Sequence, residues 1–385
     1  MRYDDAAVPL GALWSSPFAK WQGTLAETSS LDLAAAVTTR ALADRALDPA
    51  ELAGLVLGWT VPAPDVFYGA PTLAARLGMP GVTGPMVSQA CATSVAALHA
   101  AALTGGPQLV VATDRTSNGP TLSWPAPARQ GGAPVTSHWV LDAFARDPGT
   151  GEGMLATGET VAAESGFTRD EADAVAVLRS EQYVAGLASQ HRYLVPVAIP
   201  GRRSAVELAA DEGVRPVDAG TAAKLPPATP EGIHTFASQT HPADGCAGAV
   251  VTSVDHARSR GGGVVRLVAS GFARVAPAHM PQAPVPAARA ALADAGWGFG
   301  DLHAVTTHNP FAVNDLYLAR ETGIALEDMN VRGCSLVFGH PQGPTGLRSI
   351  AELVETLVDR GGGRGLFTGC AAGDTGAALV VEVDT

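Results

Sequence analysis

Residues 81–106 read GVTGPMVSQACATSVAALHAAALTGG, and this stretch determines how the first half of the chain is organised. Turn-forming glycine and proline open it, and a Gly-Gly pair closes it. Between them, Val95, Leu98 and Ala102 recur at steps of three and four residues, the spacing of one face of a helix. The stretch therefore predicts a helix packed inside a domain, with Cys91 in its first turn.

The position of Cys91 allows two interpretations. The first turn of a helix has unpaired amide groups and the positive end of the helix dipole, which favour a thiolate over a thiol. Free cysteine is, however, among the most buried residue types, and most lone cysteines serve packing. Position alone leaves both a nucleophile and a core cysteine open.

The length and composition of the chain describe a large globular protein. It has 385 residues, of which 46% are hydrophobic and 16% charged. This length suits two or three units, or one large internally repeated α/β body. No apolar run reaches membrane-spanning length and no charged, apolar-cored leader opens the sequence, so we expect a cytoplasmic protein without membrane contact.

Charge and cysteine usage exclude several classes of function. A net charge of −12 argues against general nucleic-acid binding, although a few arginines could hold a small phosphorylated ligand. Cys91, Cys246, Cys334 and Cys370 have neither CxxC spacing nor the density of a disulfide scaffold. The pattern favours a reducing compartment with one or two reactive thiols, no metal site, and core positions for Cys246 and Cys334.

The order of elements predicts three segments: an N-terminal half at 1–114, an inserted loop region at 115–240 and a C-terminal half at 241–385. The middle segment is rich in Gly, Pro, Ser and Thr, a composition typical of loops that shape binding sites. Periodicity predicts helices over 31–47, 71–77, 168–187, 286–295 and 347–358, and strands over 52–59, 108–112, 249–252, 264–268 and 302–307.

The two halves echo one another. Ala-Leu-Ala-Asp at 41–44, followed by Glu51-Leu52, recurs as Ala-Leu-Ala-Asp at 291–294, followed by Asp301-Leu302. Because the repeat falls in equivalent helix–loop–strand units, it favours an internal duplication.

Two segments near the C-terminus concentrate chemically useful groups. Residues 330–346 form a Gly- and Pro-rich loop in which His340 is the one titratable group close to the following helix. In residues 366–376 a strand ends at Cys370 and a turn of small residues follows. Such strand ends often carry catalytic groups and exposed backbone amides.

Taken in order along nearly the whole chain, these motifs resemble the thiolase family. The matching segments are 17–23, the helix that begins near Cys91, 154–159, 211–215, 235–245, Gly339-His340-Pro341, and Cys370. The resemblance implies a duplicated five-layer αβαβα fold with an inserted loop domain, usually assembled as a dimer or tetramer. It also implies coenzyme A as a substrate and no permanently bound cofactor.

The resemblance further implies roles for individual residues. Cys91 would attack a 3-oxoacyl-CoA, His340 would accept its proton, and Cys370 would handle the proton on the α-carbon. One oxyanion would meet His340 and a water held near His308, and the other would meet the amides of Cys91 and Ala372. The residues expected to contact substrate and coenzyme A are Met154, Arg215, Thr240 and Phe311.

Three positions depart from the common family pattern. His308-Asn309-Pro310-Phe311 stands where many thiolases have Asn-Glu-Ala-Phe, and it is more similar to the His-Asp-Cys-Phe of the sterol-carrier-protein-type branch. Thr240 replaces a serine that contacts coenzyme A, and Asp374 stands where glycine is common. His308 would follow a strand, with its ring facing the site and able to titrate near neutrality.

We therefore expect a thiolase-like acyl-CoA C-acyltransferase, working by thiolytic cleavage or by the reverse Claisen condensation. One alternative is a ketosynthase-like condensing enzyme, although such relatives generally have a second histidine at the position of Cys370. The other is a subunit that binds CoA esters and acts with a partner, such as a small OB-fold/zinc-ribbon protein.

Overall fold

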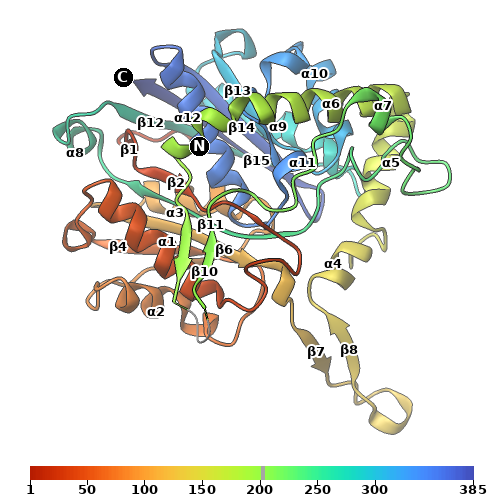
Figure 1. The fold of residues 1–385 in the computed structure, drawn as a ribbon, viewed down its shortest axis with the longest axis horizontal. Helices are drawn as coiled ribbons and strands as arrows, with labels where there is room; N and C mark the ends of the chain where they lie inside the picture. Colours follow the sequence, from red (N-terminus) through yellow and green to blue (C-terminus); the bar gives the residue numbers. More distant parts are fainter. Residues whose placement is uncertain (201–203) are drawn as a thin grey trace.

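Two mixed β-sheets form the body of the protein (Figure 1). The structure is a computed structural model that describes residues 1–200 and 204–385. The first sheet has the order β2-β11-β6-β4-β5, with the short β3 paired to β11, and the second has the order β1-β12-β15-β14-β13. The strands of the first are β2 (Leu13–Ser15), β3 (Ala19–Lys20), β4 (Gly54–Gly58), β5 (Met86–Val87), β6 (Gln108–Arg115) and β11 (Ala243–Val251). Those of the second are β1 (Ala7–Pro9), β12 (Val264–Arg274), β13 (Ala304–His308), β14 (Gly363–Ala371) and β15 (Thr375–Asp384).

The two sheets repeat one topology. In the first, β4 is parallel to β6, and β6 is antiparallel to β11. In the second, β13 is parallel to β14, and β14 is antiparallel to β15. The helix–loop–strand units that carry the Ala-Leu-Ala-Asp repeat occupy equivalent places, since α1 (Ser30–Asp44) leads to β4 and α9 (Pro284–Ala295) leads to β13. The duplicated fold expected from the sequence is thus confirmed.

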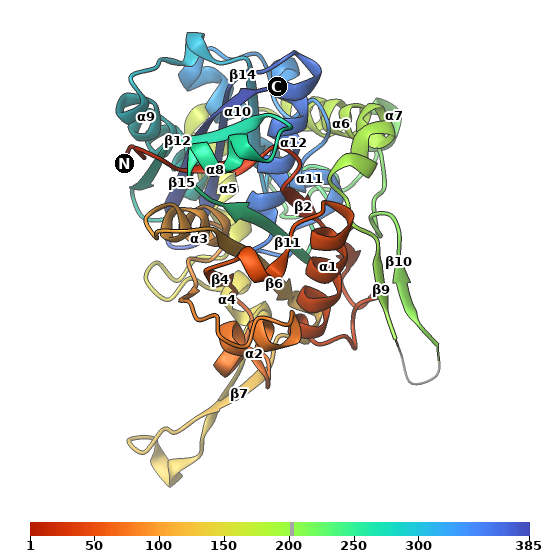
Figure 2. The same ribbon diagram turned by 90° about the vertical axis from the view of Figure 1, so that its left-hand side faces the viewer.

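Helices complete the layers. α3 (Thr93–Ala102) and α12 (Thr345–Asp359) pack on each other and each contacts strands of both sheets, so they form the central layer (Figure 2). α1 and α2 (Gly69–Arg76) cover the outer face of the first sheet, and α9 and α10 (Ala312–Thr322) lie on the outer side of the second. A Cβ on Gly346 would lie 2.8 Å from Cβ of Ser94, so glycine permits the close approach of the two central helices.

The strand sequences explain why the sheets lie inside. All five residues of β4 and all eight of β6 are buried, as expected for strands covered on both faces. The largest hydrophobic core combines both halves, because it includes Leu55 and Val110 of the first sheet and Leu379 of the second. Burying one such side chain contributes about 1.5–3 kcal/mol.

The segment between β6 and β11 forms the less regular part of the molecule. Its helices are α4 (Leu141–Ala145), α5 (Met154–Ser165), α6 (Arg169–Gly186) and α7 (Ala219–Ala222), and its strand pairs are β7 (Thr121–Trp124) with β8 (Val135–His138) and β9 (Val197–Ile199) with β10 (Val206–Leu208). The β7–β8 hairpin projects from the body (Figure 1). Thr168 begins α6 as expected, through a capping box with Glu171.

A buried ion-pair cluster ties this segment to the central layer. Both guanidinium NH groups of Arg348, on α12, donate to the carboxylate of Asp211, at 2.6 and 2.7 Å. Arg348 also pairs with Glu352 at 3.2 Å, and its guanidinium lies over the rings of Phe18 and Phe338. A buried charge is tolerated only with such partners, so the cluster holds the segment in one place over α12.

One feature bears on the predicted division of the chain. β11, which lies within residues 241–385, pairs with β6 and completes the first sheet. The division at 114 and 240 stays a prediction.

The remaining α-helices of the described residues are α8 (Val254–Ser259) and α11 (Ser335–Phe338). In the part of the chain that the structure describes, no helix combines the length and apolarity needed to span a membrane.

Candidate active site

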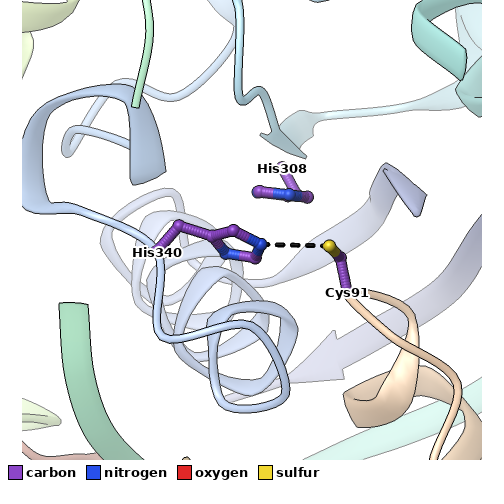
Figure 3. A group of neighbouring side chains, drawn as sticks. All are labelled: Cys91, His308 and His340. Carbon is purple, nitrogen blue, oxygen red and sulfur yellow. Dashed lines mark hydrogen bonds between the residues drawn. The ribbon is translucent and has the colours of Figure 1, made fainter. Parts of the chain in front are cut away.

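Cys91 lies on a sharp turn in front of α3. The helix begins at Thr93, so the expectation that Cys91 occupies its first turn is wrong by two residues. Ala90, the residue before it, has φ of 45°, a left-handed conformation that redirects the chain into the helix. The turn points the thiol of Cys91 toward His340 (Figure 3), and both residues line one cavity.

His340 is the hydrogen-bond partner of the Cys91 thiol. Nε2 of His340 lies 3.0 Å from Sγ of Cys91 (Figure 3). Nδ1 of His340 lies 2.7 Å from Oγ1 of Thr345. Gly339, with φ of 89°, turns the chain immediately before the histidine. With its two ring nitrogens engaged in different directions, the imidazole is held in one orientation toward the sulfur.

His308, at the end of β13, stacks on His340. Their ring centroids are 4.0 Å apart and the planes differ by 29° (Figure 3). Nδ1 of His308 lies 2.8 Å from Oγ of Ser335. Nε2 of His308 is buried and has no hydrogen-bond partner among residues 1–200 and 204–385. The position expected for His308, at a strand end facing the site, is confirmed.

The electrostatics of these groups differ from two expectations. Burial raises the pKa of the Cys91 thiol to about 12, although amides of Ala372 and Cys91 act in the opposite direction. Burial lowers the pKa of His308 to about 3. The pKa shifts favour a neutral thiol over the predicted thiolate and a His308 that does not titrate near neutrality, because burial disfavours both charged forms.

His340 experiences the same effect. Burial lowers the pKa of His340 well below its usual range, and the neighbouring His308 lowers it further. A thiolate–imidazolium pair is consequently unfavourable before substrate binds.

Cys370 belongs to β14 and faces the same cavity as Cys91. Nδ2 of Asn314, on α10, donates to its sulfur at 3.3 Å, while Oδ1 of Asn314 accepts the amide of Phe311 at 3.1 Å. Burial raises the pKa of Cys370 far above its ordinary value, and Asn314 opposes the shift. The sulfur is thus a neutral acid at rest, with one donor in place to stabilise its thiolate.

Asn309 holds the loop beneath His308. Its Nδ2 donates to Asp315 at 2.6 Å and to Sγ of Cys334 at 3.2 Å, and its Oδ1 accepts from Ser335 at 3.2 Å. Asp315 is paired with the buried Arg179 at 2.9 Å. Cys334 is buried in this cluster, and Cys246 is buried in the main core, which confirms the core positions expected for both cysteines.

The catalytic candidates converge on one cavity of about 410 Å³. The predicted residues that line it are Cys91, Met154, Thr240, His308, Phe311, His340, Cys370 and Ala372. Trp139 and Phe144 of the inserted segment close part of the wall. Arg215 is exposed and does not line this cavity, so a role for it would have to lie further along the ligand.

Asp374, the acidic departure after Cys370, has a structural role. It has φ of 58°, and its carboxylate accepts the amides of Ala278 and His279, each at 3.0 Å. The side chain thus secures the loop after β12, and it is absent from the cavity lining. Aspartate is one of the few residues besides glycine that adopt this left-handed conformation.

Ser335, Thr345 and Asn314 are positioning groups that the sequence did not single out. Each holds one of the three catalytic candidates, as described above. Thr345 lies five residues after His340 and Ser335 lies in the same Gly-rich segment, so proximity to His340 was a usable signal for both. Asn314 could be recognised only from the three-dimensional contact with Cys370.

A duplicated α/β fold with a paired cysteine and histidine beside a second cysteine defines an enzyme of the covalent-catalysis class. Family models agree with this geometry: the N-terminal thiolase domain matches residues 13–255 and the C-terminal thiolase domain matches residues 263–383. The chain belongs to the thiolase family. It is an acyltransferase of the thiolase type.

Characterised relatives span almost the whole chain. The acetyl-CoA acetyltransferase of Pseudomonas aeruginosa is 30% identical over 380 residues, covering 94% of this chain and 96% of the relative. The acetyl-CoA acetyltransferase of Shinella zoogloeoides is also 30% identical, covering 94% and 95%.

Solved structures show the same architecture. Human mitochondrial 3-ketoacyl-CoA thiolase has a TM-score of 0.89 at 22% identity and covers 99% of both chains. The acetyl-CoA acetyltransferase of Bacillus anthracis has a TM-score of 0.88 at 26% identity, also covering 99% of both. The closer likeness to the sterol-carrier-protein-type branch stays a prediction.

Proposed function

We propose that the protein interconverts a 3-oxoacyl-CoA plus coenzyme A with two shorter acyl-CoAs, through an acyl group carried on Cys91. The observation that carries this proposal is the 3.0 Å contact between Sγ of Cys91 and Nε2 of His340, with Cys370 in the same cavity. The thiol of Cys91 is paired with a base, which suits a nucleophile, whereas the thiol of Cys370 has no base beside it, which suits an acid that donates its proton.

In the first half of cleavage, Sγ of Cys91 attacks the 3-oxo carbon and its proton passes to Nε2 of His340. The bond between C2 and C3 then breaks, leaving an acyl thioester on Cys91 and a carbanion on C2 of the departing acetyl-CoA. The thiol of Cys370 protonates that carbon and becomes a thiolate. Asn314, which donates to this sulfur, stabilises the charge.

Between the two halves the proton on His340 passes to the Cys370 thiolate, and the thiol of coenzyme A then gives its own proton to Nε2 of His340 and attacks the acyl group. Sγ of Cys91 leaves and regains its proton from His340. Both cysteines end as thiols and His340 ends neutral, so the cycle is balanced. Condensation follows the same steps in reverse.

Two sets of donors would stabilise the oxyanions. The backbone of Ala372 lowers the pKa of the Cys91 thiol, which supports an oxyanion site formed by the amides of Ala372 and Cys91. The second set would come from His308, whose Nε2 has no hydrogen-bond partner in the described chain, and from Nε2 of His340, since both residues line the cavity. A donor of this kind is typically worth about 2.7–4 kcal/mol of the barrier.

The remaining cavity residues would contact the substrate. Met154 and Phe311 offer apolar surface beside the acyl group, and Thr240 lies in the wall of the same cavity. Oγ1 of Thr240 donates to the carbonyl of Ser335 at 2.5 Å, so the serine-to-threonine change is accommodated within the wall. Arg215, on the exposed side of the inserted segment, would meet the 3′-phosphate of coenzyme A.

Brief incubation with a 3-oxoacyl-CoA tests the proposal directly. The peptide that contains Cys91 should gain the mass of the shortened acyl group, and Cys91→Ser should abolish both the adduct and the thiolysis. Cys246→Ser is the matched control, since it removes a buried thiol outside the cavity and should leave the adduct in place. An adduct on Cys246 or Cys334 would contradict the assignment.

We also propose that the protein acts in the cytoplasm as a homodimer or homotetramer. Trp124 and Val135 expose 48% and 42% of their surface on the projecting β7–β8 hairpin, which supports a buried role for this hairpin between copies. Light scattering on the purified protein should give a mass of two or four chains. A monomer would contradict it, and a requirement for an added OB-fold/zinc-ribbon protein would instead favour the two-protein alternative.

A further inference from the structure

Cys91, His308 and His340 bring three metal-ligating atoms together. Their sulfur and ring nitrogens all lie within 4.8 Å of one another, the one such group of three or more among residues 1–200 and 204–385 (Figure 3). We propose that these residues bind a Zn²⁺-type ion, which occupies the catalytic centre and reversibly inhibits the enzyme. The inhibitory part rests on the proposed acyl transfer through Cys91, whereas ion binding does not.

The distances suit a small tetrahedral ion. Zinc binds thiolate at about 2.3 Å and imidazole nitrogen at about 2.0–2.1 Å, so its ligand atoms lie about 3.3–3.6 Å from one another. Sγ of Cys91 and Nε2 of His340, 3.0 Å apart, would separate slightly, and His308 would approach both. Because the two rings are stacked with planes 29° apart, His308 must rotate out of the stack for both Nε2 lone pairs to point at one ion.

The second observation is the unsatisfied nitrogen of His308. Its Nε2 is buried without a hydrogen-bond partner in the described chain, and only 1% of the residue's surface is exposed. A buried polar atom without a partner is costly, so a ligand that meets it is favoured.

In both histidines Nδ1 is hydrogen-bonded to a hydroxyl group, as the second ring nitrogen of a metal-ligating histidine usually is. Nδ1 of His308 lies 2.8 Å from Oγ of Ser335, and Nδ1 of His340 lies 2.7 Å from Oγ1 of Thr345. A ligating histidine normally bonds through its other ring nitrogen, which fixes the ring and its tautomer. A bound ion would select the tautomer in which Nδ1 is protonated and Nε2 carries the lone pair, whereas the tautomer of His308 with a proton on Nε2 is the one that can donate to a thioester oxygen.

The donor set selects the kind of ion. One thiolate and two imidazoles suit Zn²⁺ or Co²⁺ and not Mg²⁺ or Ca²⁺, which prefer oxygen. The three protein ligands leave a fourth position, which faces the cavity and would hold water or the thiol of coenzyme A. Binding displaces the proton of the Cys91 thiol and removes its sulfur from catalysis. Asparagine at position 308, the common residue in the family, would replace the nitrogen ligand with a weaker amide.

Cobalt provides a probe of binding that does not depend on activity. Titrating the full-length protein with Co²⁺ should give one equivalent of a tetrahedral spectrum with a sulfur-to-cobalt charge-transfer band, and Mg²⁺ should not compete. Cys91→Ser should remove that band, and His308→Asn should weaken binding at least about tenfold. The matched control is His279→Ala, which removes a surface histidine paired with Glu164 at 2.9 Å and should change nothing.

Activity then tests the inhibitory part. Zn²⁺ should abolish thiolysis by the wild-type protein, a chelator should restore it, and the residual activity of His308→Asn should need at least about tenfold more Zn²⁺ for the same loss. Binding unaffected by His308→Asn would overturn the metal site. Stoichiometric binding without inhibition would overturn the inhibitory role. Absence of thiolysis in metal-free wild-type protein would count against the proposed function alone, since the cobalt spectrum is read independently.

Discussion

The ring of His308 lies against the ring of His340, with centroids 4.0 Å apart and planes inclined by 29°. Both residues are buried, and burial lowers the pKa of each imidazole. A proton on either ring would be poorly solvated and would repel a proton on the other. The pair is therefore neutral in the folded protein across the physiological range, which is the form required of a base and of a hydrogen-bonding partner for a thioester.

Acidification should destabilise the fold through this pair. In the unfolded chain a histidine has a pKa of about 6.5, whereas His308 has a pKa of about 3 in the fold. The unfolded state thus binds more protons below about pH 6.5, so stability falls as the pH falls from there toward 3. At pH 5 His308 alone should cost about 2 kcal/mol of unfolding free energy relative to pH 7.5.

Comparison of His308→Asn with the wild-type protein isolates the contribution of His308 to the pH dependence of the unfolding free energy. Denaturant unfolding at pH 7.5 and at pH 5 should show that the variant loses about 2 kcal/mol less on acidification than the wild type does. The other titrating groups are shared and cancel, except that His340, whose pKa His308 also lowers, adds to the difference in the same direction. An equal loss in both proteins would mean that His308 is protonated in the fold.

The sequence predicted most of the architecture because its signals are local and repeated. The buried strands are continuous apolar runs, and Thr168 with Glu171 marks the start of α6. The turn before α3 was misjudged because a left-handed Ala90 has no clear signature in the sequence. The apolar spacing in the sequence therefore predicted a start of the helix two residues too early.

The site was less accessible to sequence reasoning than the fold. Motifs brought Cys91, His340 and Cys370 together correctly in one cavity. The protonation states were wrong for Cys91 and His308, because burial outweighs both the helix terminus and the intrinsic pKa of histidine. How deeply a side chain is buried depends on packing between distant segments, and no local pattern encodes it.

The hydroxyl of Thr345 should matter through the orientation of His340. Thr345→Val removes the 2.7 Å contact with Nδ1 and should lower kcat about tenfold with little change in KM, since one hydrogen bond is worth about 1 kcal/mol or slightly more. Thr345→Ser should restore most of the rate. Thr356→Val, which removes another buried hydroxyl of α12, is the matched control and should reduce stability without affecting kcat. A similar kcat for both valine variants would contradict the positioning role.

Cys370 should be needed for carbon–carbon chemistry but not for acylation. Cys370→Ala should abolish cleavage of a 3-oxoacyl-CoA while Cys91 still exchanges acyl groups with coenzyme A. Asn314→Asp keeps an oxygen for the amide of Phe311 but places a carboxylate beside the Cys370 sulfur. It should slow cleavage more than about tenfold and exchange much less, because only cleavage needs the Cys370 thiolate. Loss of both activities in folded protein would show that the roles are misassigned.

Arg215 should recognise the phosphate end of coenzyme A. The side chain is exposed and outside the cavity lining, which places it away from the reacting atoms. Arg215→Ala should raise KM for coenzyme A far more than KM for dephospho-coenzyme A, with kcat unchanged for both. Arg258, an exposed arginine on α8, provides the matched control. Equal changes for the two ligands would indicate a solvated arginine.

His308 should contribute to the rate as a neutral hydrogen-bonding group. Its unpartnered Nε2 faces the cavity from the end of β13, in position to donate directly or to orient a water toward the thioester oxygen. Removing one oxyanion donor typically costs about 2.7–4 kcal/mol, so His308→Ala should lower kcat by about a hundredfold or more. His308→Asn should retain more activity, because an amide also donates. Since the pKa of His308 is about 3, the acid limb of the rate profile above pH 5 should be the same in the Asn variant and the wild type. If His308→Ala kept nearly full kcat, His308 would have only a structural role at the end of β13. If the acid limb disappeared in His308→Asn, His308 would titrate during catalysis.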